Sequence, residues 1–252
     1  MNEKEIKHNI LIDISMYNTR GEFVPSAYQR MIMAMIEEHL DILHIGEKDL
    51  MEKHGISWVL LSTSIELKRQ LAPTDKLIGI TWHAGSRIPS FRRDFTFNDE
   101  EGNVVATGAT ISTLFDNSTR KLCFDRSKLS VVDLEPQAPI LDHVERKMKP
   151  PAVLELVETR KVRPSMTDGV GHVNNTKYAD FVYDAMSGSE MEKLGHIKRI
   201  DTWFNHELRV DETFDIFKGN SEDSALCFYG MRRDESRSVF DMKIAFSNDI
   251  GE

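Results

Sequence analysis

The feature that most constrains the fold of this chain is a pattern of elements that occurs twice. In the first half, residues 27–37 are almost continuously apolar and follow Pro25 and Ser26, which predicts a buried helix. Alternating or continuous apolar runs after this helix predict strands at residues 59–67, 77–82, 91–97 and 104–115. An acidic turn at residues 99–102 predicts a hairpin between the last two of these strands.

The second half repeats this order. A first strand is expected at residues 152–162 and a helix from Thr176, and further strands near residues 200–210, 213–219, 225–233 and 238–247. Between the halves, residues 129–150 contain three prolines and indicate a linker. We therefore expect an α+β protein with a double hotdog fold, in which each repeat is a long helix wrapped by an antiparallel sheet. The predicted domains are an N-terminal hotdog at 1–128, the linker at 129–150 and a C-terminal hotdog at 151–252.

Composition excludes several classes of protein. A net charge of -9 over 252 residues argues against nucleic acid or an anionic membrane as the main partner. Neither a signal peptide nor an apolar run of about 18 residues is evident, so we expect a cytoplasmic protein. Cys123 and Cys227 lack a CxxC spacing and are expected to be buried thiols. The histidines show no metal-binding spacing, so neither a metal nor a cofactor is expected.

The segment at residues 168–178 carries the chemistry. Asp168 and His172 stand four residues apart in a glycine-containing turn, and Asn174 or Asn175 can cap the helix that follows. Unpaired amides at a helix start can stabilise the oxyanion of a thioester or ester carbonyl, which suggests acyl-transfer chemistry. The alternative is a loop that only turns the chain and caps the helix. The apolar positions of this helix lie on one face: Tyr178, Phe181, Val182, Ala185 and Met186.

These residues resemble a known family, the acyl-acyl-carrier-protein thioesterases of bacteria and plant plastids. The second half carries the family motif at 168–178, and the first half carries similar landmarks at 56–59, 92–95 and 105–110. The resemblance spans nearly the whole chain. It implies hydrolysis of fatty acyl-ACP to free fatty acid and holo-ACP, which ends fatty acid synthesis, with the acyl chain held by the first repeat and catalysis in the second.

The resemblance also implies the site residues. Glu207 lies 35 residues beyond His172, in an expected strand, and would be the general base on water. His172 would orient the water or the carbonyl, and Asp168 would fix the His172 tautomer or the turn. A different assignment, with Asp168 as nucleophile or base, stays open. Amides near residues 171–174 would form the oxyanion hole, and substrate-binding residues would be Asn174, Asn175, Tyr178 and Trp58.

Two positions depart from the family pattern. Val170 stands where the family has an asparagine, and Leu208 stands beside the glutamate where an older proposal placed a nucleophilic cysteine. Valine offers no hydrogen bond to a carbonyl or a water, so a non-catalytic acyl-binding protein is one alternative. An acyl-CoA thioesterase is another.

The expected partner is acyl carrier protein, which presents the acyl chain on a phosphopantetheine arm; the chain itself is expected to be a monomer or a homodimer. Because both proteins are acidic, docking would need a local basic surface. The candidates for that surface are Lys68 and Arg69, Arg92 and Arg93, Arg120 and Lys121, and Arg160, Lys161 and Arg163.

Overall fold

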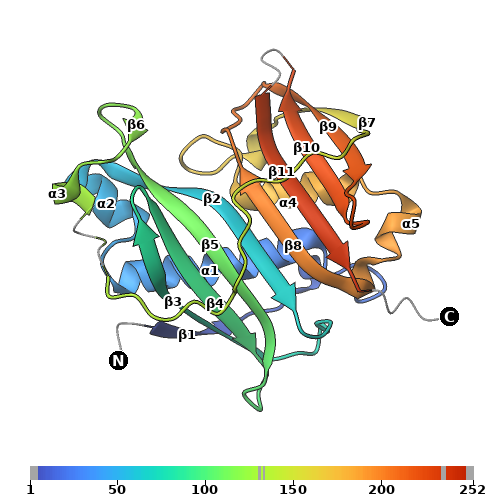
Figure 1. Ribbon diagram of the computed structural model, residues 1–252, viewed down its shortest axis with the longest axis horizontal. Helices are drawn as coiled ribbons and strands as arrows, with labels where there is room; N and C mark the ends of the chain where they lie inside the picture. Colours follow the sequence, from blue (N-terminus) through green and yellow to red (C-terminus); the bar gives the residue numbers. More distant parts are fainter. Residues whose placement is uncertain (1–4, 130–131, 133, 234–236, 248–252) are drawn as a thin grey trace. The chain divides into compact units, whose positions relative to one another are not determined.

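The computed structural model of the protein describes residues 5–129, 132, 134–233 and 237–247 (Figure 1). The chain divides into two compact units. Unit 1 holds the described residues of Met1–Ile12, Met31–Ser64 and Thr74–Val144, and unit 2 holds those of Asp13–Arg30, Ile65–Pro73 and Glu145–Glu252. Within the described residues no helix is long and apolar enough to cross a membrane.

Unit 1 is built around an antiparallel sheet with the strand order β1-β3-β4-β5-β2, and a short strand, β6, pairs with β5. The strands are β1 (Glu5–Ile10), β2 (Ile56–Leu67), β3 (Leu77–Arg87), β4 (Ser90–Asn98), β5 (Val104–Asp116) and β6 (Lys121–Leu122). The helices are α1 (Pro25–Ile42), which belongs to this unit from Met31 on, α2 (Glu47–His54) and α3 (Arg126–Leu129). α1 confirms the expected helix and extends it at both ends, whereas β1 and α2 were not expected.

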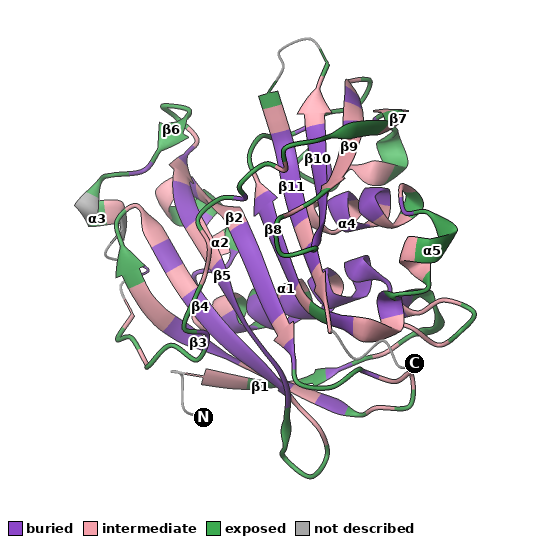
Figure 2. Cartoon of the chain, turned by 45° about the vertical axis from the view of Figure 1, so that its right-hand side comes forward, coloured by how far each residue is buried: buried purple, intermediate pink, exposed green. Residues whose placement is uncertain are grey.

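One face of this sheet packs against α1. Phe95 and Phe97 of β4 are fully buried, and their cross-strand neighbours are small: Phe97 lies opposite Gly79, and Phe95 lies opposite Gly108. A methyl group at Gly108 would overlap the Phe95 ring, so the glycine makes room for the aromatic side chain. Figure 2 shows how buried residues follow the strands and the helix sides that face them.

The other face of the same sheet holds the middle of the expected linker. The indole N–H of Trp82 donates to the Ala138 carbonyl at 3.1 Å, and the Asp94 carboxylate accepts the Ile140 amide at 2.7 Å. Asp94 is fully buried, and Arg92 binds both of its oxygens. Residues 138–140 are therefore attached to the unit 1 sheet.

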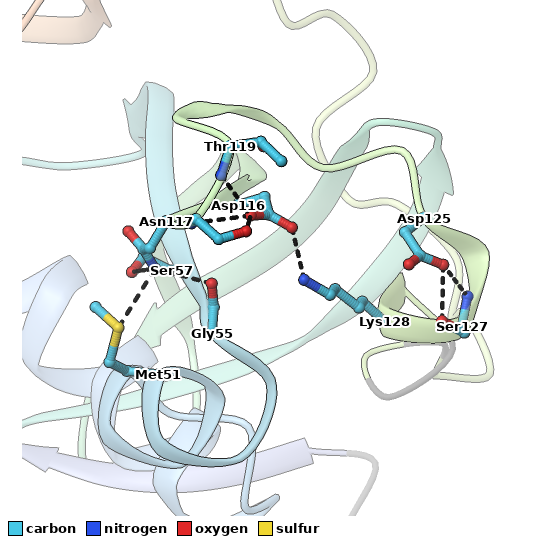
Figure 3. A network of polar contacts seen from close by, with 10 residues as sticks. Met51, Gly55, Ser57, Asp116, Asn117, Thr119, Asp125, Ser127 and Lys128 are labelled. Carbon is cyan, nitrogen blue, oxygen red and sulfur yellow. Dashed lines mark hydrogen bonds and ion pairs between the residues drawn. The ribbon is translucent and has the colours of Figure 1, made fainter.

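A polar network closes the β5–β6 turn (Figure 3). Asp116 accepts hydrogen bonds from Ser118 and Thr119 and forms an ion pair with Lys128 at 2.6 Å. Asn117 donates its side-chain amide to the Gly55 carbonyl at 3.2 Å, which joins the turn to the end of α2. The hydrogen bond from Lys128, followed by those from Ser118 and Thr119, holds the pKa of Asp116 well below its usual range.

This network predicts a pH-dependent loss of stability. A carboxylate with a depressed pKa in the folded state stabilises the fold above its unfolded pKa, about 3.9, and that contribution disappears as the pH falls below it. Asp116→Asn should therefore lower the urea midpoint at pH 7, and the gap to the wild type should begin to narrow below about pH 4 and keep narrowing as the pH falls toward the depressed pKa of Asp116. Asp49→Asn, which breaks an exposed pair with Lys53 on α2, should change the midpoint little. A gap that stays constant from pH 7 to pH 3 would contradict the assignment.

Unit 2 has the same plan, with the strand order β8-β11-β10-β9-β7. The strands are β7 (Glu155–Lys161), β8 (Ile197–Phe204), β9 (Thr213–Asn220), β10 (Leu226–Arg232) and β11 (Arg237–Phe246). The helices are α4 (Asn175–Asp184) and α5 (Gly188–Met191), with 3-10 turns at Ile14–Met16, Pro164–Met166 and Leu194–His196. Cys227 of this unit and Cys123 of unit 1 are both buried free thiols, as expected.

Helix α4 packs on this sheet through aromatic rings. Tyr178 lies 5.0 Å from Phe240, and Phe181 lies 5.3 Å from Phe214, measured between ring centroids. The helix is shorter than its apolar pattern predicts. It ends at Asp184, so the last two apolar positions, 185 and 186, lie outside it. The reason lies in the next residues, where the Ser187 side chain caps α5 in a capping box with Glu190 and so starts a new helix.

Candidate active site

The segment with Asp168 and His172 forms a tight loop. The Asp168 amide donates to the His172 carbonyl at 3.0 Å, and the Gly171 amide donates back to the Asp168 carbonyl at 3.0 Å. Gly171 has a φ of 85°, a conformation that favours glycine. The Asp168 carboxylate accepts the Val170 amide at 3.0 Å. The Asp168 carboxylate thus bonds the backbone of the turn that presents His172.

The loop leads directly into α4. Asn174 is the N-cap, as one of the two expected candidates: its side-chain oxygen accepts the Thr176 amide at 3.0 Å and the Thr176 hydroxyl at 2.7 Å. Asn175 is the first residue of the helix. The start of α4 is therefore fixed three residues after His172.

This cap carries its own prediction. Asn174→Ala should destabilise the protein by about 1 kcal/mol, because it leaves first-turn amides without an acceptor. Asn174→Asp keeps the acceptor and should unfold within about 0.5 kcal/mol of the wild type. Urea unfolding monitored by circular dichroism measures both. Equal losses in the two variants would show that the cap contributes nothing.

Glu207 does not lie in a strand, which corrects the expectation of a strand over 200–210. β8 ends at Phe204, because the Asn205 and His206 amides both turn to one acceptor, the Val239 carbonyl, at 2.9 and 3.1 Å. Two residues opposite one is the arrangement of a β-bulge, which bends the strand and redirects the side chains that follow. Glu207 is presented by the irregular segment after this bulge.

Leu208 joins that segment to the loop before α4. Its side chain is fully buried, and its carbonyl accepts the Val173 amide at 2.8 Å. The Arg232 guanidinium donates to the Glu207 carbonyl at 2.9 Å and holds the backbone from the other side. These contacts place Glu207 and Leu208 beside the loop that carries His172.

As a result, His172 and Glu207 meet. The His172 Nε2 lies 3.1 Å from the Glu207 Oε2, and the Arg209 guanidinium bonds the other oxygen, Oε1, at 2.8 Å. The His172 side chain is 27% exposed and that of Glu207 47% exposed, so water reaches both. An imidazole and a carboxylate in contact, open to solvent beside a helix start, can activate a water for attack on a carbonyl.

The other expected substrate-binding residues have different surroundings. Tyr178 lies in the first turn of α4 and is only 2% exposed, and this burial raises the pKa of its hydroxyl. Trp58 belongs to unit 1, where its indole N–H donates to the Ile45 carbonyl at 2.8 Å and its ring meets Phe91 edge-on at 5.5 Å. Trp58 can therefore offer a ligand only its ring.

Most of the amides expected in the oxyanion hole are engaged. Gly171 donates to Asp168, Val173 to Leu208, and Asn174 to the Met166 carbonyl at 3.0 Å. In the described part of the chain, the His172 amide makes no such backbone bond. The Asn175 amide lies in the first helical turn, where amides have no partner within the helix. The His172 amide is therefore the remaining candidate of the expected set, and the Asn175 amide, outside that set, is a second candidate.

Several of the expected basic docking residues are neutralised or buried. Arg92 is bound to Asp94, and Arg93, 7% exposed, contacts the His39 ring; burial lowers the pKa of Arg93 to about 10. The contact between Arg93 and His39, 54 residues apart, is invisible in a single sequence. The other paired cations are Lys68 with Glu66, Arg160 with Glu158 and Asp184, and Lys161 with Asp211. Exposed members of the set include Lys121 and Arg163.

Sequence reasoning also missed residues that surround Glu207. Asn205 and Arg209 each lie two residues from Glu207 and could have been found from that spacing, whereas Arg232 and Asp241 are brought in by the fold and have no local signal. Among the described residues, no group of three or more metal-ligating side chains is placed to hold a metal ion.

The comparisons with known proteins match both halves of the chain. The family model of the acyl-ACP thioesterase N-terminal domain covers residues 4–124, and that of the C-terminal domain covers residues 154–248. The chloroplastic dodecanoyl-[acyl-carrier-protein] hydrolase of Cinnamomum camphora is 24% identical over 192 residues, which are 70% of this chain. The match covers 49% of that relative, so the chain spans about half the length of the plant protein.

Two solved structures share the fold over nearly their full length. An acyl-ACP thioesterase from Bacteroides thetaiotaomicron has a TM-score of 0.82 and 19% identity, with 98% of this chain and 100% of the other covered. The 12:0-ACP thioesterase of Umbellularia californica has a TM-score of 0.80 and 18% identity, with 96% and 97% covered. The expected α+β double hotdog fold is confirmed. With family models matched over residues 4–124 and 154–248, the chain belongs to the acyl-ACP thioesterase family.

Proposed function

We propose that the chain is a thiolester hydrolase that cleaves fatty acyl-ACP to free fatty acid and holo-ACP and so ends fatty acid synthesis. The observation that carries this proposal is the contact between His172 and Glu207 at the start of α4, in a chain whose two halves both match acyl-ACP thioesterase models. An exposed acid–imidazole pair supplies what thioester hydrolysis by water needs.

In the proposed reaction Glu207 is the general base. Its carboxylate takes a proton from a water molecule while the water oxygen attacks the thioester carbon. The C–S bond then breaks, the phosphopantetheine thiolate leaves, and the proton passes to its sulfur. His172 contacts Glu207 at 3.1 Å and orients the water and the carbonyl beside this pair. Asp168 fixes the turn, in line with its hydrogen bond to the Val170 amide.

The oxyanion of the tetrahedral intermediate would be bound by backbone amides. We assign this role to His172 and Asn175, because their amides are not used by the loop. Val170 is 63% exposed and gives the site no hydrogen bond from its side chain, so these amides must replace the family's asparagine. Asn174 and Tyr178 would support the site by fixing the helix start and its packing.

We further propose that the repeat at 1–128 binds the acyl chain, that 129–150 links the repeats, and that 151–252 carries catalysis. Trp58 would contact the acyl chain through its apolar ring. The protein would act in the cytoplasm as a monomer or homodimer, and its partner would be acyl carrier protein. The carrier would dock on exposed cations such as Arg163, and the phosphopantetheine arm of the carrier would enter the site.

A direct comparison of substrates tests the carrier assignment. Fatty acid release is measured with the same acyl group on ACP and on CoA, for the wild type and for Arg163→Gln. We expect a higher kcat/KM for the carrier ester, and a loss in Arg163→Gln that is larger for the carrier than for CoA and that vanishes at high salt. Equal kcat/KM for both esters would favour an acyl-CoA thioesterase.

A further inference from the structure

Asp241 is a buried carboxylate that the proposed reaction does not use. It lies in β11 opposite Trp203 of β8 and is 7% exposed. Its hydrogen bonds come from neutral donors: the Ser238 hydroxyl reaches Oδ1 at 2.6 Å, and the Asn205 side-chain amide reaches Oδ2 at 2.9 Å. Burial raises the pKa of Asp241. A buried carboxylate is costly unless it is paired or hydrogen-bonded, so these two donors are what allows Asp241 to be buried here.

The donors lead to the bulge before Glu207. Asn205 is the first residue after β8, and its side chain also donates to the Ser238 hydroxyl at 2.9 Å. The His206 ring Nδ1 lies 2.8 Å from the Ser238 carbonyl, and both backbone amides of the bulge donate to Val239. Residues 238–241 of β11 thus hold residues 205 and 206 through both backbone and side chains.

The segment is held equally firmly beyond Glu207. Leu208 is buried and bonded to Val173, and Arg232 bonds the Glu207 carbonyl. Glu207 is therefore exposed between two anchors, one at Asn205 and His206 and one at Leu208. The first anchor ends on Asp241.

We infer that Asp241, together with Ser238 and Asn205, is a positioning group that fixes the bulge so that the Glu207 carboxylate faces His172. This inference rests on the proposed function. Asp241 touches no reacting atom and acts through Asn205. A displacement of a catalytic group by about 1 Å costs on the order of a hundredfold in rate, so a loosened bulge has a measurable effect.

The test is a mutant cycle with Glu207. Asp241→Asn keeps the size of the side chain but replaces one acceptor oxygen by a donor, so it can no longer accept from both Ser238 and Asn205. We expect Asp241→Asn to lower kcat about tenfold or more with KM within about twofold. In the Glu207→Gln background the same change should lower the remaining kcat by less than about twofold, because the group being positioned is already lost.

A matched control lies in the same unit. Asp223 also accepts a serine hydroxyl, that of Ser221 at 2.5 Å, in the turn between β9 and β10. Asp223→Asn should leave kcat within about twofold of the wild type. If Asp241→Asn fails to fold, Asn205→Ala and Ser238→Ala carry the same cycle. A loss of kcat that is equally large in the Glu207→Gln background would overturn the inference, and so would unchanged kcat in all three folded variants.

A spectroscopic readout separates this inference from the proposed function. The ring 15N resonances of His172 report its contact with Glu207, whether or not the protein turns over a thioester. We expect Asp241→Asn to move them toward their positions in Glu207→Gln, and Asp223→Asn to leave them unchanged. Unmoved resonances in Asp241→Asn overturn the positioning role, whereas moved resonances in a protein without any hydrolysis uphold it and reject the thioesterase proposal.

Discussion

Glu207→Gln is expected to lower kcat for acyl-ACP hydrolysis by at least about a hundredfold, the scale of a lost general base. Gln has nearly the same shape and can still accept the hydrogen bond from Arg209, but it cannot take a proton from water. The loss should therefore appear in kcat, with KM little changed. Because the side chain is 47% exposed, the unfolding midpoint should stay close to that of the wild type. Steady-state release of free fatty acid from acyl-ACP measures the effect.

The chain provides a matched control for this variant. Glu66 pairs at 2.8 Å with Lys68, a cation two residues away, just as Glu207 pairs with Arg209. The difference is that Glu207 also contacts the imidazole of His172. Glu66→Gln should keep kcat within about twofold of the wild type. If both variants retain full activity, Glu207 is not the base, and the assignment with Asp168 as nucleophile or base takes its place.

His172→Ala is expected to lower kcat by about a hundredfold or more, because it removes the group that orients the water and the carbonyl. Since His172 and Glu207 act on the same water, the double variant should lose little beyond either single variant. Losses that multiply in the double variant would show that the two residues act independently. Rates are measured with acyl-ACP at saturating concentration.

The control here is His44→Ala. His44 also lies near a carboxylate, that of Asp49 at 3.8 Å, but it is 81% exposed and belongs to unit 1. This variant should match the wild type in kcat and in unfolding midpoint. An equal loss in both histidine variants would point to a general effect of the substitution and would remove the specific role of His172.

Sequence reasoning succeeded where local patterns decide the structure. The Asn174 cap, the apolar face of α4 and the alternating strands depend on residues within a few positions of one another. The repeated order of helix and strands was therefore visible, and the double hotdog fold followed from it. The motif at 168–178 also gave the turn and the helix start together.

It failed where distant residues decide the structure. Nothing near Glu207 shows that β8 ends at Phe204, because the bulge is made by the Val239 carbonyl more than thirty residues later. In the same way, the sequence predicts a surface cation at Arg93, but the fold buries this residue against His39, 54 residues away. The positioning group at Asp241 has no signal in the sequence for the same reason.

The measurement that tests the proposed activity most directly is the release of free fatty acid from a series of acyl-ACP substrates by the wild-type protein, with its folding checked by circular dichroism. We predict release from at least one chain length, in proportion to the enzyme added, and its loss in Glu207→Gln. A folded wild-type protein that binds acyl-ACP but releases no fatty acid from any member of the series would contradict the proposal and would favour a non-catalytic acyl-binding protein.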